Sequence, residues 1–348
     1  MQTEVFGVLE GQTVEAVTLS NGGIKARLIT YGARLTELWV PDALGRLADV
    51  VLGFDDLQSY VATDTYFGAT CGQYANRIAG GHCRIDDTDI ALDRNEGPNH
   101  LHGGSLGFDR KIWRIAALDD NSVTFSATSE DSEMGFPGRS ILSARYHLTH
   151  EGALEIEMTA DTDKPTLMNM VHHSYFNLAG QGTGPVLDHD LQINGAFYTP
   201  VDATLLPTGE IRAVAETPFD FRTLRPVGQE IAALCPSPVG GGYDHNWCLD
   251  SLNGPMHAAA TLRDPRSGRV LKVSTTEPGL QVYTGGFLDD RIIGKKGARL
   301  CRFAGVALET QKYPGSPGFA HFPDCILRPG EIYRHRMRLE FTADAPEK

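Results

Sequence analysis

A carboxylate and several histidines lie in segments whose residue types and spacing predict acid–base chemistry. Glu309 ends the apolar run Phe303–Leu308 and precedes a loop rich in proline and glycine. A carboxylate at the end of a buried strand costs free energy unless it is paired, hydrogen-bonded or used. Histidines cluster in two other segments, Asn99–Gly104 and Val171–Asn177. Because a carboxylate and a histidine can exchange protons at neutral pH, the chain is predicted to be an acid–base enzyme.

The first histidine cluster is compatible with three kinds of site. His100 and His102 would share one face of a strand, so a cupin-like metalloenzyme could use them together with Glu309. Such a site would require a further carboxylate a few residues on, and glycines follow instead. Polar loop histidines bonded to backbone are the second alternative. Contact with a substrate is favoured, because Gly103 and Gly104 let the backbone approach a ligand closely.

The second cluster contains two adjacent histidines, His172 and His173. Neighbouring residues of a strand point to opposite faces, so only one of them can enter a given pocket. We expect the other to be structural.

Three further side chains are suited to a hydroxylated ligand. Arg77 offers a fork of hydrogen-bond donors, although a surface ion pair would explain it equally well. Asp244 offers an acceptor and Trp247 an apolar platform, a pairing that suits the hydroxyls and the apolar face of a sugar. A turn would also explain Asp244.

Charge and composition exclude several classes of protein. A net charge of −13 argues against nucleic acid and against an anionic membrane surface as partners. Residues 1–10 lack the pattern of a signal peptide, and no stretch of 18 apolar residues predicts a transmembrane helix. The six cysteines include no Cys-x-x-Cys pair, so we expect free thiols in a reducing cytoplasm. Neither a Gly-x-Ser-x-Gly elbow nor a P-loop is present.

Short strands must position these residues. Residues 142–148 and 154–159 alternate between apolar and polar side chains on either side of a turn at 151–152, which is typical of a hairpin with one solvated face. Residues 123–127 predict a neighbouring strand, and residues 333–341 give the clearest alternation.

Helical periodicity is scarce. Residues 55–60 and 228–234 are the candidates for short helices, and residues 264–268 predict a hairpin turn. Many short antiparallel strands with closely spaced turns predict an all-β fold, a large antiparallel β-sandwich. Without a visible linker or repeat, residues 1–348 are expected to form a single domain.

Several motifs, taken in order, resemble the aldose 1-epimerase (galactose mutarotase) family. The resemblance extends from about residue 20 to residue 340. It is carried by Thr30–Ala33, Val51–Phe54, Gly72–Ile78, Asn99–Gly104, Gly107–Asp109, Trp113, His173–Leu178, Tyr243–His245, Gly279–Gly285, Leu308–Gln311 and Leu327–Glu331. It implies a sandwich of the galactose mutarotase type.

The resemblance also implies an activity, the interconversion of the α and β anomers of a free aldose. The family's general base, a glutamate before Thr-Gln, matches Glu309, and its general acid, the histidine before Ser-Tyr-Phe, matches His173. No metal or redox cofactor is implied. The acid must be protonated, so we expect a nearby carboxylate, Asp244 or Glu309 itself, to raise the pKa of His173.

Other motif residues are implied to bind the sugar. His102 matches the sugar-contacting histidine of the family's Leu-His-Gly-Gly motif, and Asn76 and Arg77 lie in its Ala-Asn-Arg-Ile motif. Asp244 matches the aspartate before histidine, and Gln281 matches the glutamine of Gly-Leu-Gln, expected in the pocket wall.

The chain departs from the family pattern at five positions. Gln73 replaces an arginine, His172 an asparagine, Gly286 an asparagine, and Lys312 and Tyr313 replace histidine and phenylalanine. None of these changes removes a catalytic group, and all are expected to line or support the pocket and so to affect the choice of sugar.

Alternatives to an epimerase of free aldoses are the cupin-like metalloenzyme and a non-catalytic carbohydrate-binding β-sandwich. An epimerase of phosphorylated sugars would require clustered Arg and Lys, and Gln73 speaks against it. The expected partner is a small aldose, with the chain a monomer or homodimer.

Overall fold

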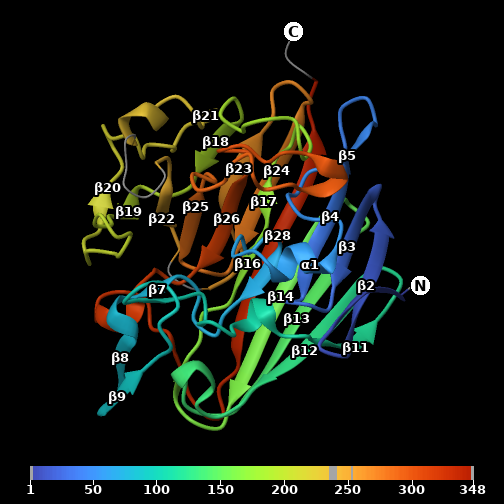
Figure 1. Cartoon of the computed structure of the whole chain (residues 1–348). Coiled ribbons are helices and arrows are strands. Elements are labelled where there is room, and N and C mark those ends of the chain that lie inside the picture. The colour runs from blue at the N-terminus through green and yellow to red at the C-terminus, as the bar shows by residue number, and fades with distance from the viewer. Residues whose placement is uncertain (1–2, 235–240, 252–253, 346–348) are drawn as a thin grey trace.

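The computed structural model describes residues 3–234, 241–251 and 254–345 (Figure 1). In this part of the chain one α-helix is present, α1 (Leu57–Val61), begun by Asp56, whose carboxylate accepts from the Ser59 amide. The remaining helical segments are single 3₁₀ turns. They are η1 (Ala79–Gly81), η2 (Phe108–Arg110), η3 (Glu133–Gly135), η4 (Ile231–Leu234), η5 (Lys295–Gly297) and η6 (Ser316–Gly318).

The largest sheet contains the strands whose alternation was clearest in the sequence. Among the described residues it has nine antiparallel strands. In spatial order they are β11 (Arg114–Leu118), β12 (Ser122–Ser129), β13 (Ser140–Leu148), β14 (Ala153–Thr162), β28 (Tyr333–Ala343), β24 (Arg269–Thr275), β23 (His257–Arg263), β18 (Asp190–Ile193) and β21 (Arg225–Pro226). The predicted hairpins at 142–159 and around 264–268 are confirmed.

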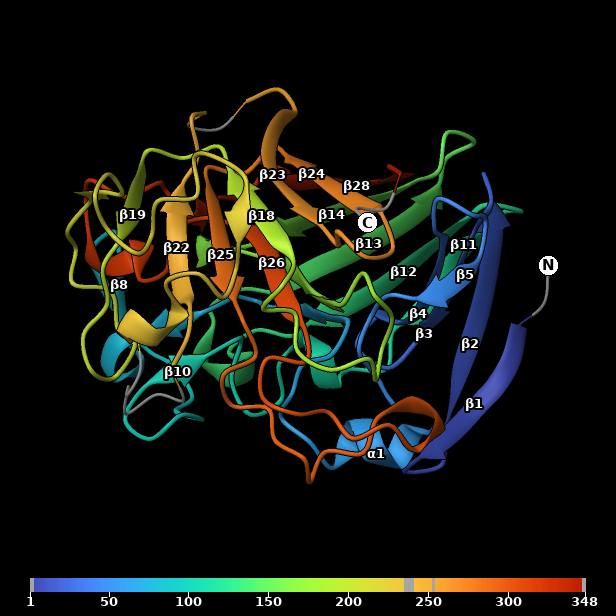
Figure 2. The ribbon, with the colours of Figure 1, turned by 90° about the horizontal axis from the view of Figure 1, so that it is seen from above.

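A six-stranded sheet carries the candidate base. Its strands, in order along the described part of the sheet, are β17 (Tyr175–Phe176), β26 (Val306–Gln311), β25 (Gly279–Tyr283), β22 (Asp244–Cys248), β19 (Phe197–Thr199) and β20 (Arg212–Ala213). In Figures 1 and 2, β25 and β26 lie against one face of the nine-stranded sheet. The two sheets touch where Thr310 of β26 and His335 of β28 form a 2.7 Å hydrogen bond.

A third sheet and several short strand pairs complete the described structure. The third sheet runs β1 (Thr3–Leu9), β2 (Gln12–Asn21), β3 (Ile24–Ile29), β4 (Arg34–Pro41) and β5 (Leu47–Asp49). The pairs are β6 (Ala69–Cys71) with β16 (Val171–His173), β7 (Arg77–Ile78) with β10 (His100–Leu101), β8 (His82–Ile85) with β9 (Thr88–Ala91), and β15 (Thr166–Leu167) with β27 (Ile326–Leu327).

One buried apolar cluster joins the three larger sheets. Leu28 of β3, Leu142 of β13, Val282 of β25 and Leu339 of β28 all belong to it, and none of them is exposed to solvent. Burying so many aliphatic side chains between sheet faces is the main stabilisation of such a sandwich. The predicted all-β antiparallel fold with few short helices is therefore confirmed.

Two further predictions concern helices and cysteines. No helix in residues 3–234, 241–251 or 254–345 is long and apolar enough to cross a membrane. Five cysteines in those ranges are free thiols, namely Cys71, Cys83, Cys248, Cys301 and Cys325. Cys235, the sixth, lies outside the described residues.

Candidate active site

Strand β26 carries Glu309 into the interior of the molecule. The strand continues to Gln311, so Glu309 lies within it rather than at its end as the sequence suggested. In the antiparallel register Glu309 lies opposite Gln281 of β25, which in turn lies opposite Asn246 of β22. Residues opposite one another share a sheet face, and Asp244, two residues before Asn246, shares it as well. The sheet thus sets Glu309, Gln281 and Asp244 on one face.

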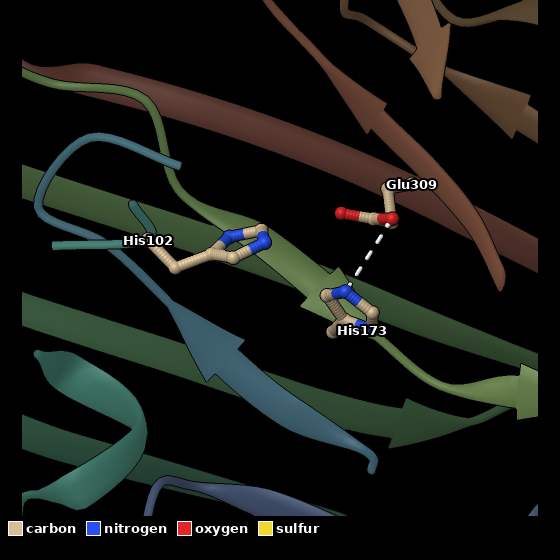
Figure 3. Close-up of side chains that lie close together, drawn as sticks. All are labelled: His102, His173 and Glu309. Atoms are coloured by element: carbon tan, nitrogen blue, oxygen red, sulfur yellow. Dashed lines mark ion pairs between the residues drawn. The ribbon is translucent and has the colours of Figure 1, made fainter. Parts of the chain in front are cut away.

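His173 reaches the same place from β16. Its Nε2 lies 3.5 Å from Oε1 of Glu309, and both side chains are nearly fully buried (Figure 3). The neighbouring His172 points the opposite way, where its Nε2 and the Ser174 hydroxyl are 2.7 Å apart. This confirms that only one histidine of the pair enters the cavity.

His102 completes a group of three side chains from distant parts of the chain (Figure 3). Its Nδ1 accepts a hydrogen bond from the backbone N–H of Asn76 at 3.3 Å. The ring proton of neutral His102 must therefore be on Nε2, which makes that nitrogen a donor. Gly103 holds this turn in place, because a Cβ there would lie 1.7 Å from the carbonyl oxygen of Gly72. The close approach expected at Gly103 is thus made to backbone rather than to a ligand.

These side chains line a cavity of about 380 Å³, large enough for a small polar molecule. Of the predicted site residues, Asn76, Arg77, His102, His173, Asp244 and Glu309 line it. Asn76 (φ 66°), His102 (φ 51°) and the cavity residue Tyr66 (φ 55°) all adopt positive φ. Strained backbone of this kind clusters at functional sites.

Gln281 has a different place from the one expected. It is not among the described residues that line the cavity; instead its Nε2 donates to Oδ1 of Asp244 at 2.6 Å. The other carboxylate oxygen of Asp244 lies 3.8 Å from Nη1 of Arg77. Arg77 in turn makes two short hydrogen bonds, of 2.7 and 2.8 Å, to the carboxylate of Glu96. A chain of charged and polar groups therefore fixes Asp244 and Arg77 at the cavity wall.

Sequence reasoning missed the aromatic walls of the cavity. The ring of Tyr66 lies 4.7 Å from that of His102 and 5.7 Å from that of His173, and Tyr175 lies 5.1 Å from His173. Trp247, expected as the apolar platform, is fully buried behind the sheet, where it donates to the carbonyl of Phe219. A residue an odd number of positions along the strand from Asp244 points to the opposite face of the sheet. Trp247 is three positions away, so this spacing could have excluded it as a wall of the cavity.

Burial dominates the electrostatics of the acid and the base. It raises the pKa of Glu309 well above its usual value, the nearby Asp244 raises it further, and Arg77 opposes the shift. Burial also lowers the pKa of His173 to about 4. The expected upward shift of the His173 pKa is therefore wrong, because loss of hydration lowers the pKa, Arg34 lowers it further, and only a backbone hydrogen bond opposes the shift. The pKa of His102 is lowered as well, again chiefly by burial.

The three side chains also have the composition of a metal site. Ligand atoms of His102, His173 and Glu309 all lie within 4.8 Å of one another. A metal-binding histidine normally donates its second ring N–H to an acceptor, whereas Nδ1 of His102 faces the N–H of Asn76. The tautomer that this contact selects protonates the nitrogen that would have to bind the metal. His100, the other proposed ligand, has its Nδ1 2.7 Å from the carbonyl of Asp93, outside the cavity lining. The residues present therefore do not fit a resident metal.

None of the five positions that depart from the family pattern is among the described residues that line the cavity. Gln73 donates to the Thr166 hydroxyl at 2.7 Å, and Gly286 precedes the cavity residue Phe287. Lys312 and Tyr313 follow β26, and Lys312 lines a different cavity.

Comparisons with known proteins agree with this geometry. The family model described as aldose 1-epimerase matches residues 15–340. The chain is 41% identical over 340 residues to the galactose mutarotase of Bos taurus, covering 97% of both chains. It is 35% identical over 339 residues to the aldose 1-epimerase of Escherichia coli K12, covering 96% of this chain and 97% of that one.

Solved structures show the same likeness. An aldose epimerase homologue from C. elegans superposes with a TM-score of 0.87 at 31% identity, covering 94% of this chain and 98% of that one. A galactose 1-epimerase from Lactobacillus acidophilus gives 0.84 at 27%, covering 98% of each chain. The chain therefore belongs to the aldose 1-epimerase family of isomerases.

Proposed function

We propose that the chain interconverts the α and β anomers of a free aldose, with Glu309 as general base and His173 as general acid. The observation that carries the proposal is the 3.5 Å separation of Nε2 of His173 and Oε1 of Glu309, two buried side chains that line the same cavity. Family membership supports the reaction, and the geometry supports the two roles.

The proposed reaction needs two proton transfers. Glu309 takes the proton of the anomeric hydroxyl as the C1–O1 bond becomes a carbonyl. The bond between C1 and the ring oxygen breaks, and its electron pair takes a proton from His173. Rotation about C1–C2 turns the other face of the aldehyde toward the C5 hydroxyl. Closure reverses both transfers, so no atom, electron or proton is gained or lost.

A single proton shared by Glu309 and His173 is sufficient for this cycle. With the closed sugar the productive state is an ionised Glu309 and a protonated His173. After ring opening the proton is on Glu309 and His173 is neutral. Burial raises the pKa of Glu309 and lowers that of His173, so it favours the second, uncharged arrangement. The sugar's hydroxyls must therefore stabilise the ion pair in the closed-ring complex.

The remaining wall residues are suited to hold the sugar. Arg77 and the Nε2–H of His102 supply donors, and Asp244 supplies an acceptor, in the lining of the same cavity. Asn76 supports this group through its backbone, since its N–H fixes His102. Tyr66 and Phe287 provide apolar surface for the face of a pyranose ring.

Polarimetry of freshly dissolved α-D-galactose or α-D-glucose tests the proposal. The wild-type protein should accelerate the approach to anomeric equilibrium, and removing either Glu309 or His173 should abolish most of the acceleration. Binding without acceleration would instead indicate a carbohydrate-binding sandwich. Because relatives are named galactose mutarotases, galactose is the first sugar to test.

Three sequence-based predictions stay predictions. They are the single domain over residues 1–348, the cytoplasmic location, and the monomeric or homodimeric state. Size-exclusion chromatography with light scattering would decide the last of them.

A further inference from the structure

A second polar cavity, of about 400 Å³, is lined by residues that follow β26, precede β25 and begin β28. Thr310, which follows Glu309 and points to the opposite face, bonds to His335 of β28. Lys312 lies two residues further on and lines the second cavity together with Tyr333 of β28. The cavity therefore lies beside the end of β26 and the start of β28.

Two oppositely charged side chains with little exposure to solvent, Glu277 and Lys312, line this cavity. Glu277 lies just before β25 and Lys312 just after β26, and the pairing of Gly279 with Gln311 brings them together. The side chains of Glu277 and Lys312 are 4% and 13% exposed. Charged groups are rarely buried to this extent unless they are fully paired or used.

Glu277 and Lys312 face each other without a direct hydrogen bond. Nζ of Lys312 lies 3.8 Å from Oε2 of Glu277, beyond the length of a hydrogen bond. Within the described residues Oε2 of Glu277 has no hydrogen-bond partner. This oxygen therefore bears the cost of desolvation without the hydrogen bond that normally offsets it. A hydroxyl group can satisfy both partners at once, because it donates to a carboxylate and accepts from an ammonium group. The long, flexible side chain of Lys312 can move to admit it.

The charges around the cavity favour a neutral ligand. Its described lining carries as many acidic as basic side chains, namely Glu277, Asp324 and Glu331 with Lys312, Arg334 and Arg336. Apolar surface is also present, from the buried residues Met168, Cys325 and Tyr333. Acidic and basic side chains in equal number can accept from and donate to hydroxyl groups, and the apolar wall can contact carbon atoms. This combination suits a polyhydroxylated compound better than an anion or a cation.

We propose that this cavity is a second carbohydrate-binding site, separate from the one that contains Glu309. A neutral monosaccharide would place a hydroxyl between Glu277 and Lys312 and its apolar face against Tyr333. Its described lining contains no histidine and hence no acid–base pair like Glu309 and His173, so we expect it to bind without catalysing.

Equilibrium dialysis with radiolabelled D-galactose tests the proposal on the full chain. The wild-type protein should bind two molecules per chain at saturation. The double variant Glu277→Gln/Lys312→Met should bind one, because it removes both charges while preserving side-chain length. It should keep the mutarotation rate and KM of the wild type, which would show that the remaining molecule occupies the catalytic cavity.

Lys272→Met is the matched control, since Lys272 is exposed on β24 away from this cavity. It should bind two molecules. The proposal would be overturned if the wild type saturates at one molecule per chain. It would also be overturned if the wild type and the double variant both bind two. Unaltered mutarotation in either case would leave the catalytic assignment standing. The double variant removes both charges together, so neither is left buried without its partner, and circular dichroism would test whether it folds.

Discussion

Nε2 of His173 lies 3.5 Å from Oε1 of Glu309, with both side chains removed from water. Burial acts on the two groups in opposite senses, since it raises the pKa of the carboxyl and lowers that of the imidazole. A pair at this distance titrates as one unit, so its behaviour is described by the number of protons it holds. The proposed cycle requires that number to be one.

The pH profile of kcat/KM should reflect this pair. A second proton enters as pH falls toward about 4, the lowered pKa of His173, and the base is then lost. The single proton is lost as pH rises through the raised pKa of Glu309, and the acid is then lost. We expect a plateau that extends well below the usual histidine pKa of about 6.5. A rate that already falls as pH drops through 6.5 would contradict a His173 pKa lowered by burial.

The fold should be more stable without the charge of Glu309. Its folded pKa is raised, so the folded state binds more protons than the unfolded one above pH 4.5, and stability falls as pH rises. Glu309→Gln removes that penalty and should raise the free energy of unfolding at pH 8 by at least about 1 kcal/mol. Near pH 4 the gain should vanish.

Urea denaturation at the two pH values measures this difference. Glu10→Gln, a change at an exposed residue, is the control and should leave stability almost unchanged at both. A Glu309→Gln variant less stable than wild type at pH 8 would show that the carboxylate is stabilised rather than penalised in the fold.

Gln281 should act on substrate binding through Asp244. Gln281→Met removes the 2.6 Å hydrogen bond that fixes the Asp244 carboxylate. A hydrogen bond to a charged group contributes about 1.5–3 kcal/mol, so KM should rise about tenfold or more, with kcat changed much less. Steady-state kinetics separates the two constants. A fall in kcat with KM unchanged would place Gln281 in the chemical step instead.

Metal removal should have no effect on the rate. The Asn76 N–H fixes His102 in the tautomer that protonates the potential ligand nitrogen. Dialysis against EDTA should therefore leave mutarotation unchanged, and one equivalent of Zn²⁺ should not inhibit it. Loss of activity on chelation, restored by Zn²⁺, would favour the metalloenzyme alternative.

Periodicity predicted the fold well, because strands such as β13, β14 and β28 are half-buried and alternate strictly. Motif resemblance named six residues that line the cavity, including Glu309 and His173. Local sequence could not predict Tyr66 or Glu96, which reach the cavity only through tertiary packing and carry no spacing signal. It also gave the wrong sign for the pKa of His173, since the degree of burial is a property of the folded chain.

The central claim is that Glu309 and His173 transfer the protons that open and close the ring. Exchange NMR at anomeric equilibrium with saturating D-galactose measures interconversion of the α and β forms directly, without a coupled enzyme. Glu309→Gln and His173→Asn should each lower this exchange rate by at least ~10²-fold while the circular dichroism spectrum stays that of the wild type. Exchange near the wild-type rate in a folded Glu309→Gln variant would contradict the assignment.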